Sequence, residues 1–135
     1  MCTTSHVLGY QDDTWSCGVA VAPVADFRFY DSIYTERYMQ DTITNKEGYE
    51  KSNAMGSLDP KKYFGKYTVI HGTGDDNVHF QNSAVMTKEI IKQGFEFNAY
   101  FYADEQHGIN SDSHQHNHVY SLIWRKLNDC LNDRL

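Results

Sequence analysis

Positive charge is scarce in this sequence. Its 135 residues include 12 Lys and Arg against 18 Asp and Glu, a formal net charge of −6. Proteins that bind nucleic acids neutralise phosphates with clustered basic side chains, so this balance argues against nucleic-acid binding.

Long apolar runs and paired cysteine motifs are also missing. No stretch approaches the roughly 20 consecutive apolar residues of a membrane span. Residues 1–9 have neither the charged nor the apolar region of a signal peptide, so any such signal is expected outside this chain. The cysteines, Cys2, Cys17 and Cys130, match no short metal-ligand spacing and allow at most one disulfide.

What the sequence does contain favours one globular α/β unit. Hydrophobic residues make up 40% and aromatic residues 14%, which argues against disorder. Residues 17–24, CGVAVAPV, suit a central strand buried on both faces. Residues 67–71, YTVIH, and 95–102, FEFNAYFY, also read as strands. The last two enclose a helical pattern, which predicts parallel strands joined by a right-handed crossover.

Helices are expected between and after these strands. Residues 31–39, DSIYTERYM, predict a short helix capped by Asp31, and residues 41–65 predict a loop with at most one helical turn. The crossover helix is predicted from the stripe Phe80, Ala84, Thr87 and Ile91, with Gly94 as its cap. A last helix is predicted from Val119, with Val119, Ile123, Leu127 and Cys130 facing the core.

Two polar loops follow successive predicted strands. In α/β sheets the loops at the carboxyl ends of strands hold the functional groups. Asp75, in the first loop, precedes His107, in the second, by 32 residues, the order of the acid and base of an α/β-hydrolase triad. Spacing alone does not choose between Asp75 and Asp76, and it equally allows both to be helix caps with His107 a solvated loop residue.

Two other places in the sequence contain residues capable of chemistry. The hydrolase elbow Gly-x-Ser-x-Gly does not occur, and the nearest string, TWSCG at 14–18, leads directly into a strand, so Ser16 is not expected to be a nucleophile. His114, His116 and His118 alternate, and on an extended segment they would share one side as zinc or copper ligands. A solvated polar loop explains them better, and we expect no metal site.

Several strings together resemble a known family. CGVAVAPV, YDSIYTERYM, IHGTGDDNVHFQNSA and YADEQHG occur in the order and spacing of the dipeptidyl peptidase IV and fibroblast activation protein subfamily of the prolyl oligopeptidase family. The resemblance covers residues 3–130. It implies the C-terminal portion of an α/β-hydrolase fold, with a mostly parallel sheet flanked by helices, and no cofactor.

The resemblance also assigns roles to residues. It implies that Asp75, the first of the pair, is the triad aspartate and that His107 is the triad histidine. Asn77 would hold the carbonyl of the substrate backbone. The pocket for proline would be walled by Tyr30 and Tyr34 and lined further by Val24, Phe27 and Val78.

A disulfide is implied in the same way. Extracellular members of the family carry one where Cys17 and Cys130 stand, so the resemblance predicts this pair and an oxidising compartment. The expected setting is extracellular or at the cell surface, with any anchor outside this chain. Cys2 has no predicted partner.

The sequence also departs from the family. The elbow with the serine, expected just before Thr3, and the β-propeller are not in it, and Phe27 stands where relatives often carry Trp. We therefore expect residues 1–135 to be the C-terminal part of a catalytic domain and to be inactive alone.

The predicted function is that of the parent protein. We expect it to be a serine dipeptidyl peptidase that releases Xaa-Pro or Xaa-Ala dipeptides from peptide N termini and forms a homodimer. Leu122, Trp124 and Leu131 are candidate dimer contacts. The alternative is a non-enzymatic relative that binds a partner, against which the retained acid and base argue.

Overall fold

A parallel β-sheet forms the centre of the computed structural model, which describes residues 4, 15, 17–56, 66–94 and 96–132. Its strands lie in the order β1 (Gly18–Val21), β2 (Tyr67–Gly72) and β3 (Asn98–Tyr102). Both strand pairs are parallel, as predicted. The central strand is β2 and not residues 17–24, because β1 pairs only with β2 among the described residues.

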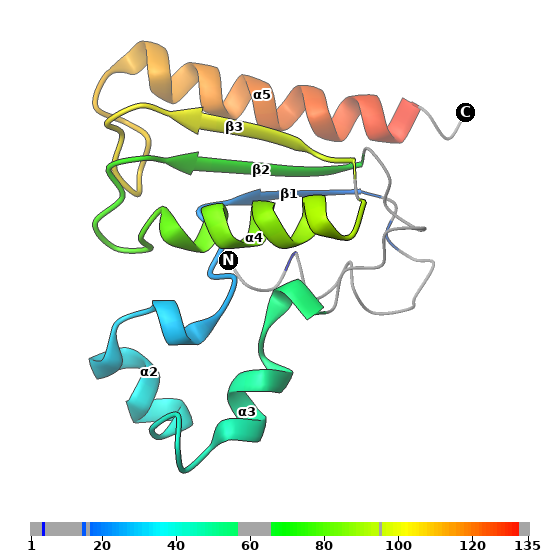
Figure 1. Cartoon of the computed structure of the whole chain (residues 1–135). Helices are drawn as coiled ribbons and strands as arrows, with labels where there is room; N and C mark the ends of the chain where they lie inside the picture. The colour runs from blue at the N-terminus through cyan, green and yellow to red at the C-terminus, as the bar shows by residue number, and fades with distance from the viewer. Residues whose placement is uncertain (1–3, 5–14, 16, 57–65, 95, 133–135) are drawn as a thin grey trace.

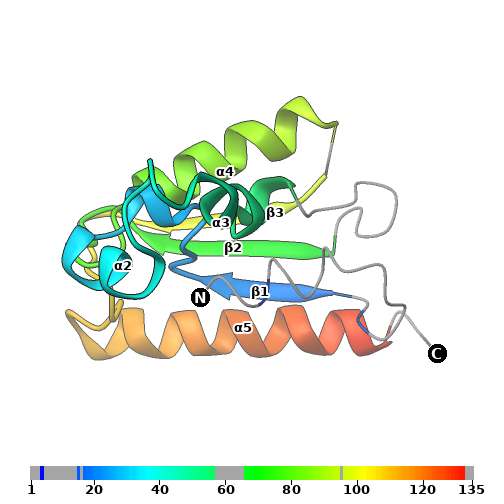
Figure 2. The ribbon, with the colours of Figure 1, turned by 90° about the horizontal axis from the view of Figure 1, so that it is seen from below.

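The two faces of the sheet carry separate cores. Ala20 and Val69 point to one face, where they pack in a cluster with Met86 of helix α4 (Gln81–Lys92). The next residue of β2, Ile70, packs on the other face with Val119 of helix α5 (Ser113–Asn132). Figure 2 shows α4 and α5 on opposite sides of the strands. Successive side chains of a strand point to opposite faces, so β2 is buried on both.

The predicted stripe of the crossover helix is wrong. Ala84 and Ile91 are exposed, and the buried side chains of α4 are Asn82, Ser83, Met86 and Ile90. Polar residues occupy the buried face because they find partners there. The Asn82 side-chain oxygen accepts from the Ala25 backbone N–H at 3.1 Å. The expected end at Gly94 is confirmed, with φ of 73°.

The last helix begins six residues before the predicted start at Val119. Asp112 caps it, since its carboxylate accepts from the Gln115 backbone N–H at 2.9 Å. Leu122 is buried rather than available for a dimer, whereas the predicted core residue Leu127 is 38% exposed. The capping residue Asp112 is the sequence signal for this earlier start.

The segment between β1 and β2 holds the remaining described elements: η1 (Phe27–Phe29), α2 (Ser32–Met39), α3 (Lys46–Lys51) and η2 (Ala54–Gly56). Helix α2 is confirmed with its cap, because Asp31 accepts from the Tyr34 backbone N–H at 2.8 Å. The short helix α3 gives residues 41–56 more helix than the single turn expected. Figures 1 and 2 place α2 near the carboxyl ends of the strands.

Cys17 and Cys130 form a disulfide that joins the start of β1 to the last turn of α5. Their Cα atoms are 6.3 Å apart, within the usual range for a disulfide. Cys2 and Ser16 lie outside the described residues. None of the described helices has the length and apolar character needed to cross a membrane.

Candidate active site

The loops that follow β2 and β3 lie against each other. The Thr73 backbone N–H donates to the Tyr102 carbonyl at 2.9 Å, and that of Gly74 donates to the Glu105 carbonyl at 3.0 Å. A Cβ atom at Gly72 would overlap the Glu105 carbonyl, so only glycine permits this approach. Contacts between backbone atoms thus hold the two loops together.

Asp75 is turned inward by its own loop. One carboxylate oxygen, Oδ1, accepts from the backbone N–H groups of Asn77 and Val78, each at 2.9 Å. The other oxygen, Oδ2, accepts from His107 Nδ1 at 2.8 Å. The neighbouring Asp76 is exposed. The structure therefore brings Asp75, and not Asp76, to the histidine.

His107 connects this carboxylate to a cavity. Its Nδ1 is held by Asp75, which leaves Nε2 as the lone-pair nitrogen of the neutral ring. No described residue forms a hydrogen bond with Nε2. The side chain of His107 is 44% exposed, whereas that of Asp75 is 0% exposed. A buried acid that orients an accessible imidazole is the arrangement needed for general-base chemistry.

The cavity beside His107 has a volume of about 290 Å³. Its wall contains His107 and the six residues predicted to bind substrate: Val24, Phe27, Tyr30, Tyr34, Asn77 and Val78. These residues come from the segment after β1, from η1 and α2, and from the loop after β2. The structure thus brings together all the predicted substrate-binding residues.

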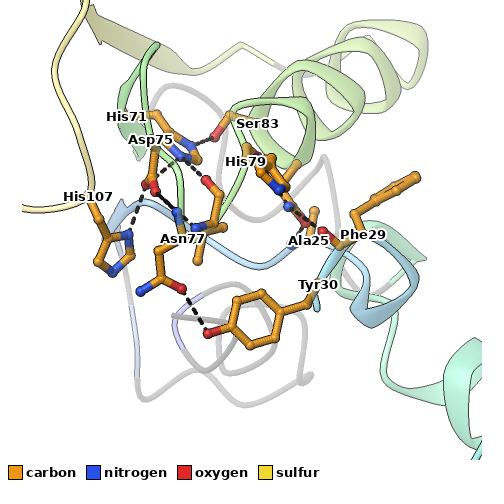
Figure 3. A network of polar contacts seen from close by, with 11 residues as sticks. Ala25, Phe29, Tyr30, His71, Asp75, Asn77, His79, Ser83 and His107 are labelled. Atoms are coloured by element: carbon orange, nitrogen blue, oxygen red, sulfur yellow. Dashed lines mark hydrogen bonds and ion pairs between the residues drawn. The ribbon is translucent and has the colours of Figure 1, made fainter. Parts of the chain in front are cut away.

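Aromatic rings and one amide give the cavity its shape. The rings of Tyr30 and Tyr34 meet edge to face, with centroids 5.5 Å apart. The Tyr30 hydroxyl donates to Asn77 Oδ1 at 2.9 Å. Since this bond uses the amide oxygen, the Asn77 NH₂ group is left for another acceptor. Figure 3 shows Tyr30 and Asn77 below the acid–base pair.

Sequence reasoning missed two residues behind the pair. His71, at the end of β2, is fully buried, and its Nε2 lies 3.0 Å from Asp75 Oδ2 and 2.8 Å from the Val78 carbonyl oxygen. Its Nδ1 lies 2.7 Å from Ser83 Oγ of α4. The only signal in the sequence was that His71 stands four residues before Asp75. At the end of the apolar run YTVIH, a histidine is read as part of a buried strand.

Burial and hydrogen bonds set the protonation states of this cluster. Burial by itself would raise the pKa of Asp75, but the His107 hydrogen bond and the two backbone N–H donors outweigh it and hold the pKa below 3.8. Burial is also the main influence on His71, whose pKa falls below 6.5. Burial likewise raises the pKa of the Tyr30 phenol. At neutral pH the cluster therefore holds a carboxylate, a neutral His71 and a neutral phenol.

These shifts predict how acid destabilises the protein. The unfolded chain protonates His71 near pH 6.5 while the native state does not, so stability should fall as the pH drops below that value. The contribution of Asp75 is present above pH 3.8 and is lost as the pH falls through its lower native pKa. Urea denaturation of the protein between pH 8 and 5 measures the first effect, with His71→Gln as the control. An equal slope in both proteins would contradict it.

Two other places in the described chain do not form a comparable site. A larger cavity of about 570 Å³ borders η1, but the buried carboxylate in its wall, Asp26, is already paired with Arg28 at 2.5 Å. His114, His116 and His118 lie on α5 rather than on an extended segment, so the three imidazoles do not share one side. Among the described residues no group of three possible metal ligands comes together.

Comparison with known proteins identifies the architecture. The family model described as "Prolyl oligopeptidase family" matches residues 2–134. The chain belongs to the prolyl oligopeptidase family. The predicted subfamily is confirmed as well. Dipeptidyl peptidase 4 of Bos taurus is 43% identical over 129 residues, covering 94% of this chain and 17% of the relative. Prolyl endopeptidase FAP of Mus musculus is 42% identical over 120 residues, covering 86% of this chain and 15% of the relative.

A solved member of the prolyl oligopeptidase family has the same fold. The crystal structure of Porphyromonas gingivalis dipeptidyl peptidase 4 matches with a TM-score of 0.87 and 36% identity, covering 96% of this chain and 18% of that one. The predicted α/β-hydrolase class, with a mostly parallel sheet flanked by helices, is confirmed. The chain spans only about a sixth of the length of the curated relatives that it matches.

Proposed function

We propose that this chain is the part of a dipeptidyl peptidase catalytic domain that supplies the acid, the base and the proline pocket. The parent enzyme would release Xaa-Pro or Xaa-Ala dipeptides from peptide N termini. The observation that carries this proposal is that His107, held by Asp75 at 2.8 Å, lines the same cavity as the aromatic pair Tyr30 and Tyr34.

In the proposed reaction His107 is the general base. Its Nε2 takes the proton from a nucleophilic hydroxyl and then donates it to the leaving amine. Asp75 keeps the proton of the neutral ring on Nδ1 and stabilises the imidazolium that forms. The four hydrogen bonds to Asp75 support this role, because they keep the carboxylate ionised.

The proposed substrate pocket follows from its chemistry. A flat, apolar pyrrolidine ring would pack against Tyr30, Tyr34 and Val78, which line the same cavity. The Asn77 NH₂ group would donate to a carbonyl of the substrate, since Tyr30 already occupies the amide oxygen. Phe27, a smaller ring than the Trp of many relatives, would leave a wider rim.

The proposed nucleophile is a serine outside residues 1–135. Within the described residues no hydroxyl is bonded to His107 Nε2, and the chain corresponds to 17% of the bovine relative. We place residues 1–135 as one part of the catalytic domain, with the serine and the oxyanion N–H donor supplied by other parts of the parent. The chain alone should then cleave nothing.

A chromogenic amide assay tests this function. The parent protein is given Gly-Pro, Gly-Ala and Gly-Leu p-nitroanilides, and we expect kcat/KM to fall in that order because the pocket fits pyrrolidine best. The 135-residue chain and the parent with His107→Ala are the controls, and both should be inactive. Parent turnover no faster than the His107→Ala control would contradict the proposal, and measurable peptide binding without turnover would favour the non-enzymatic alternative.

The proposed location of the parent is the extracellular space or the cell surface. The Cys17–Cys130 disulfide supports it, since structural disulfides persist in oxidising compartments and are rare in the cytosol. A membrane anchor, where one exists, would lie outside this chain.

The proposed parent is a homodimer with α5 in the interface. Four apolar side chains recur along one exposed face of this helix at helical spacing: Tyr120, Trp124, Leu127 and Leu131. Trp124 is 69% exposed, so Trp124→Asp should leave the core intact and shift the parent toward monomer. Light scattering after gel filtration measures this, with His114→Asp at the start of α5 as a matched control. An unchanged dimer mass in Trp124→Asp would remove α5 from the interface.

A further inference from the structure

His71 exchanges no proton in the proposed reaction, yet it is a fully enclosed titratable group beside the acid–base pair. Its relative exposure is 0%, and it does not line the cavity. Three groups form hydrogen bonds with it: Ser83 from α4, and the Val78 carbonyl and the Asp75 carboxylate from the loop after β2. Through Asp75 it reaches His107. A ring held on every side in this way has one orientation.

The hydrogen bonds determine where the proton of His71 lies. Nε2 is within 3.0 Å of two acceptors, Asp75 Oδ2 and the Val78 carbonyl oxygen, neither of which has a proton to give. Nε2 must therefore carry the N–H. Nδ1 is then the acceptor, and Ser83 donates its hydroxyl proton to it at 2.7 Å. Burial, which lowers the pKa of His71, keeps this single neutral tautomer at physiological pH.

Asp75 Oδ2 thus receives two N–H donors, one from each histidine. His71 approaches at 3.0 Å from the buried side and His107 at 2.8 Å from the cavity side. Figure 3 shows the contacts running from Ser83 through His71 and Asp75 to His107. A neutral donor on a carboxylate stabilises its negative charge, so the carboxylate attracts a second, cationic partner less strongly.

We propose that His71 is a positioning residue that fixes the Asp75 carboxylate and lowers the basicity of His107, with Ser83 setting the tautomer of His71. This inference rests on the proposed peptidase function for its consequence in catalysis. The hydrogen-bond relay itself can be tested without turnover.

The first test uses the unaltered 135-residue chain labelled with ¹⁵N-histidine. Long-range ¹H–¹⁵N correlation distinguishes the two neutral tautomers and the imidazolium of each histidine. We expect His71 to keep one proton, on Nε2, between pH 8 and 5. A proton on Nδ1 of His71, or an imidazolium at His71 in this range, would overturn the proposal.

The second test compares two substitutions at the same position. His71→Gln keeps an N–H donor at the reach of Nε2, and His71→Leu removes it. We expect His71→Leu to raise the pKa of His107 by about 0.5 to 1 pH unit, and His71→Gln to leave it near the wild-type value. The titratable groups that face this cluster, Asp75 and Tyr30, are the same in both variants. An unmoved His107 pKa in a folded His71→Leu protein would overturn the proposal, and should that variant not fold, the tautomer measurement above decides.

The catalytic consequence is read in the parent peptidase. In His71→Leu the acidic limb of the kcat/KM profile should move upward by the same 0.5 to 1 unit or so, with KM little changed because His71 does not line the cavity. His71→Gln should restore the wild-type profile. An inactive wild-type parent would refute the proposed function while the NMR titration still decides the role of His71; an active parent with an unmoved limb in His71→Leu would refute the relay alone.

Discussion

Replacing His107 with alanine in the proposed parent peptidase is expected to lower kcat on a Gly-Pro amide by about a millionfold, the size of the loss when a triad histidine is removed. The reason is geometric. His107 Nε2 is the basic atom of the acid–base pair that faces the cavity, and none of the other described residues in the cavity wall is a histidine or a carboxylate. The release of p-nitroaniline, followed over long incubations for the variant, measures the loss.

Asp75→Asn is the matched variant, because it keeps the shape of the side chain and removes its charge. We expect about a ten-thousandfold loss of kcat, since an amide in this position no longer fixes the productive tautomer of the histidine. KM should change little, as Asp75 does not line the cavity. Asp76→Asn, one residue further and exposed, is the control and should keep full activity. Equal losses in the two variants would contradict the assignment.

Removing the disulfide is expected to have the largest effect on stability. Cys17 and Cys130 are 113 residues apart in sequence. In the chain-entropy description, closing a loop of this length stabilises the native state by about 5 kcal/mol, an effect comparable to the whole stability of many domains. Cys17→Ser with Cys130→Ser should therefore lower the urea midpoint strongly and leave the protein partly unfolded at 37 °C.

Two controls separate this effect from general damage. Cys2→Ser should leave the midpoint unchanged, because the bridge joins Cys17 and Cys130. Mass spectrometry without reduction should show the wild-type pair oxidised. Without the cross-link the denatured state of the double variant should be less compact and expose more surface. We therefore expect its m-value in urea to be higher than that of wild type. A midpoint equal to that of wild type would mean that strain cancels the entropic gain.

The strands could be predicted because apolar, β-branched runs leave few alternatives. Residues 67–72 form a strand buried on both faces. The helical pattern between this strand and the next indicated that the two are parallel, as they are. Helix faces were less predictable. Asn82 and Ser83 lie on the buried side of α4 because Ala25 and His71 supply partners for them, and these partners are distant in sequence.

The same limit applies to the candidate site. Strand order placed Asp75 and His107 at the same edge of the sheet, and the spacing of the two loops was enough to pair them as candidates. The choice against Asp76 came only from the family resemblance, and in the structure it is the Asx-type turn of Asp75 onto Asn77 and Val78 that turns this carboxylate inward. His71 could not be found this way, because a single histidine in an apolar strand is usually an ordinary core residue.

The position of the disulfide has a mechanical consequence. Because it joins the start of β1 to the last turn of α5, nearly all the described chain lies inside one covalent ring. A force applied to the two ends of the chain would pass through the two sulfur atoms, and the sheet, α4 and the candidate site would carry none of it. A protease that cuts once between Cys17 and Cys130 would likewise leave two pieces that stay joined until the bridge is reduced.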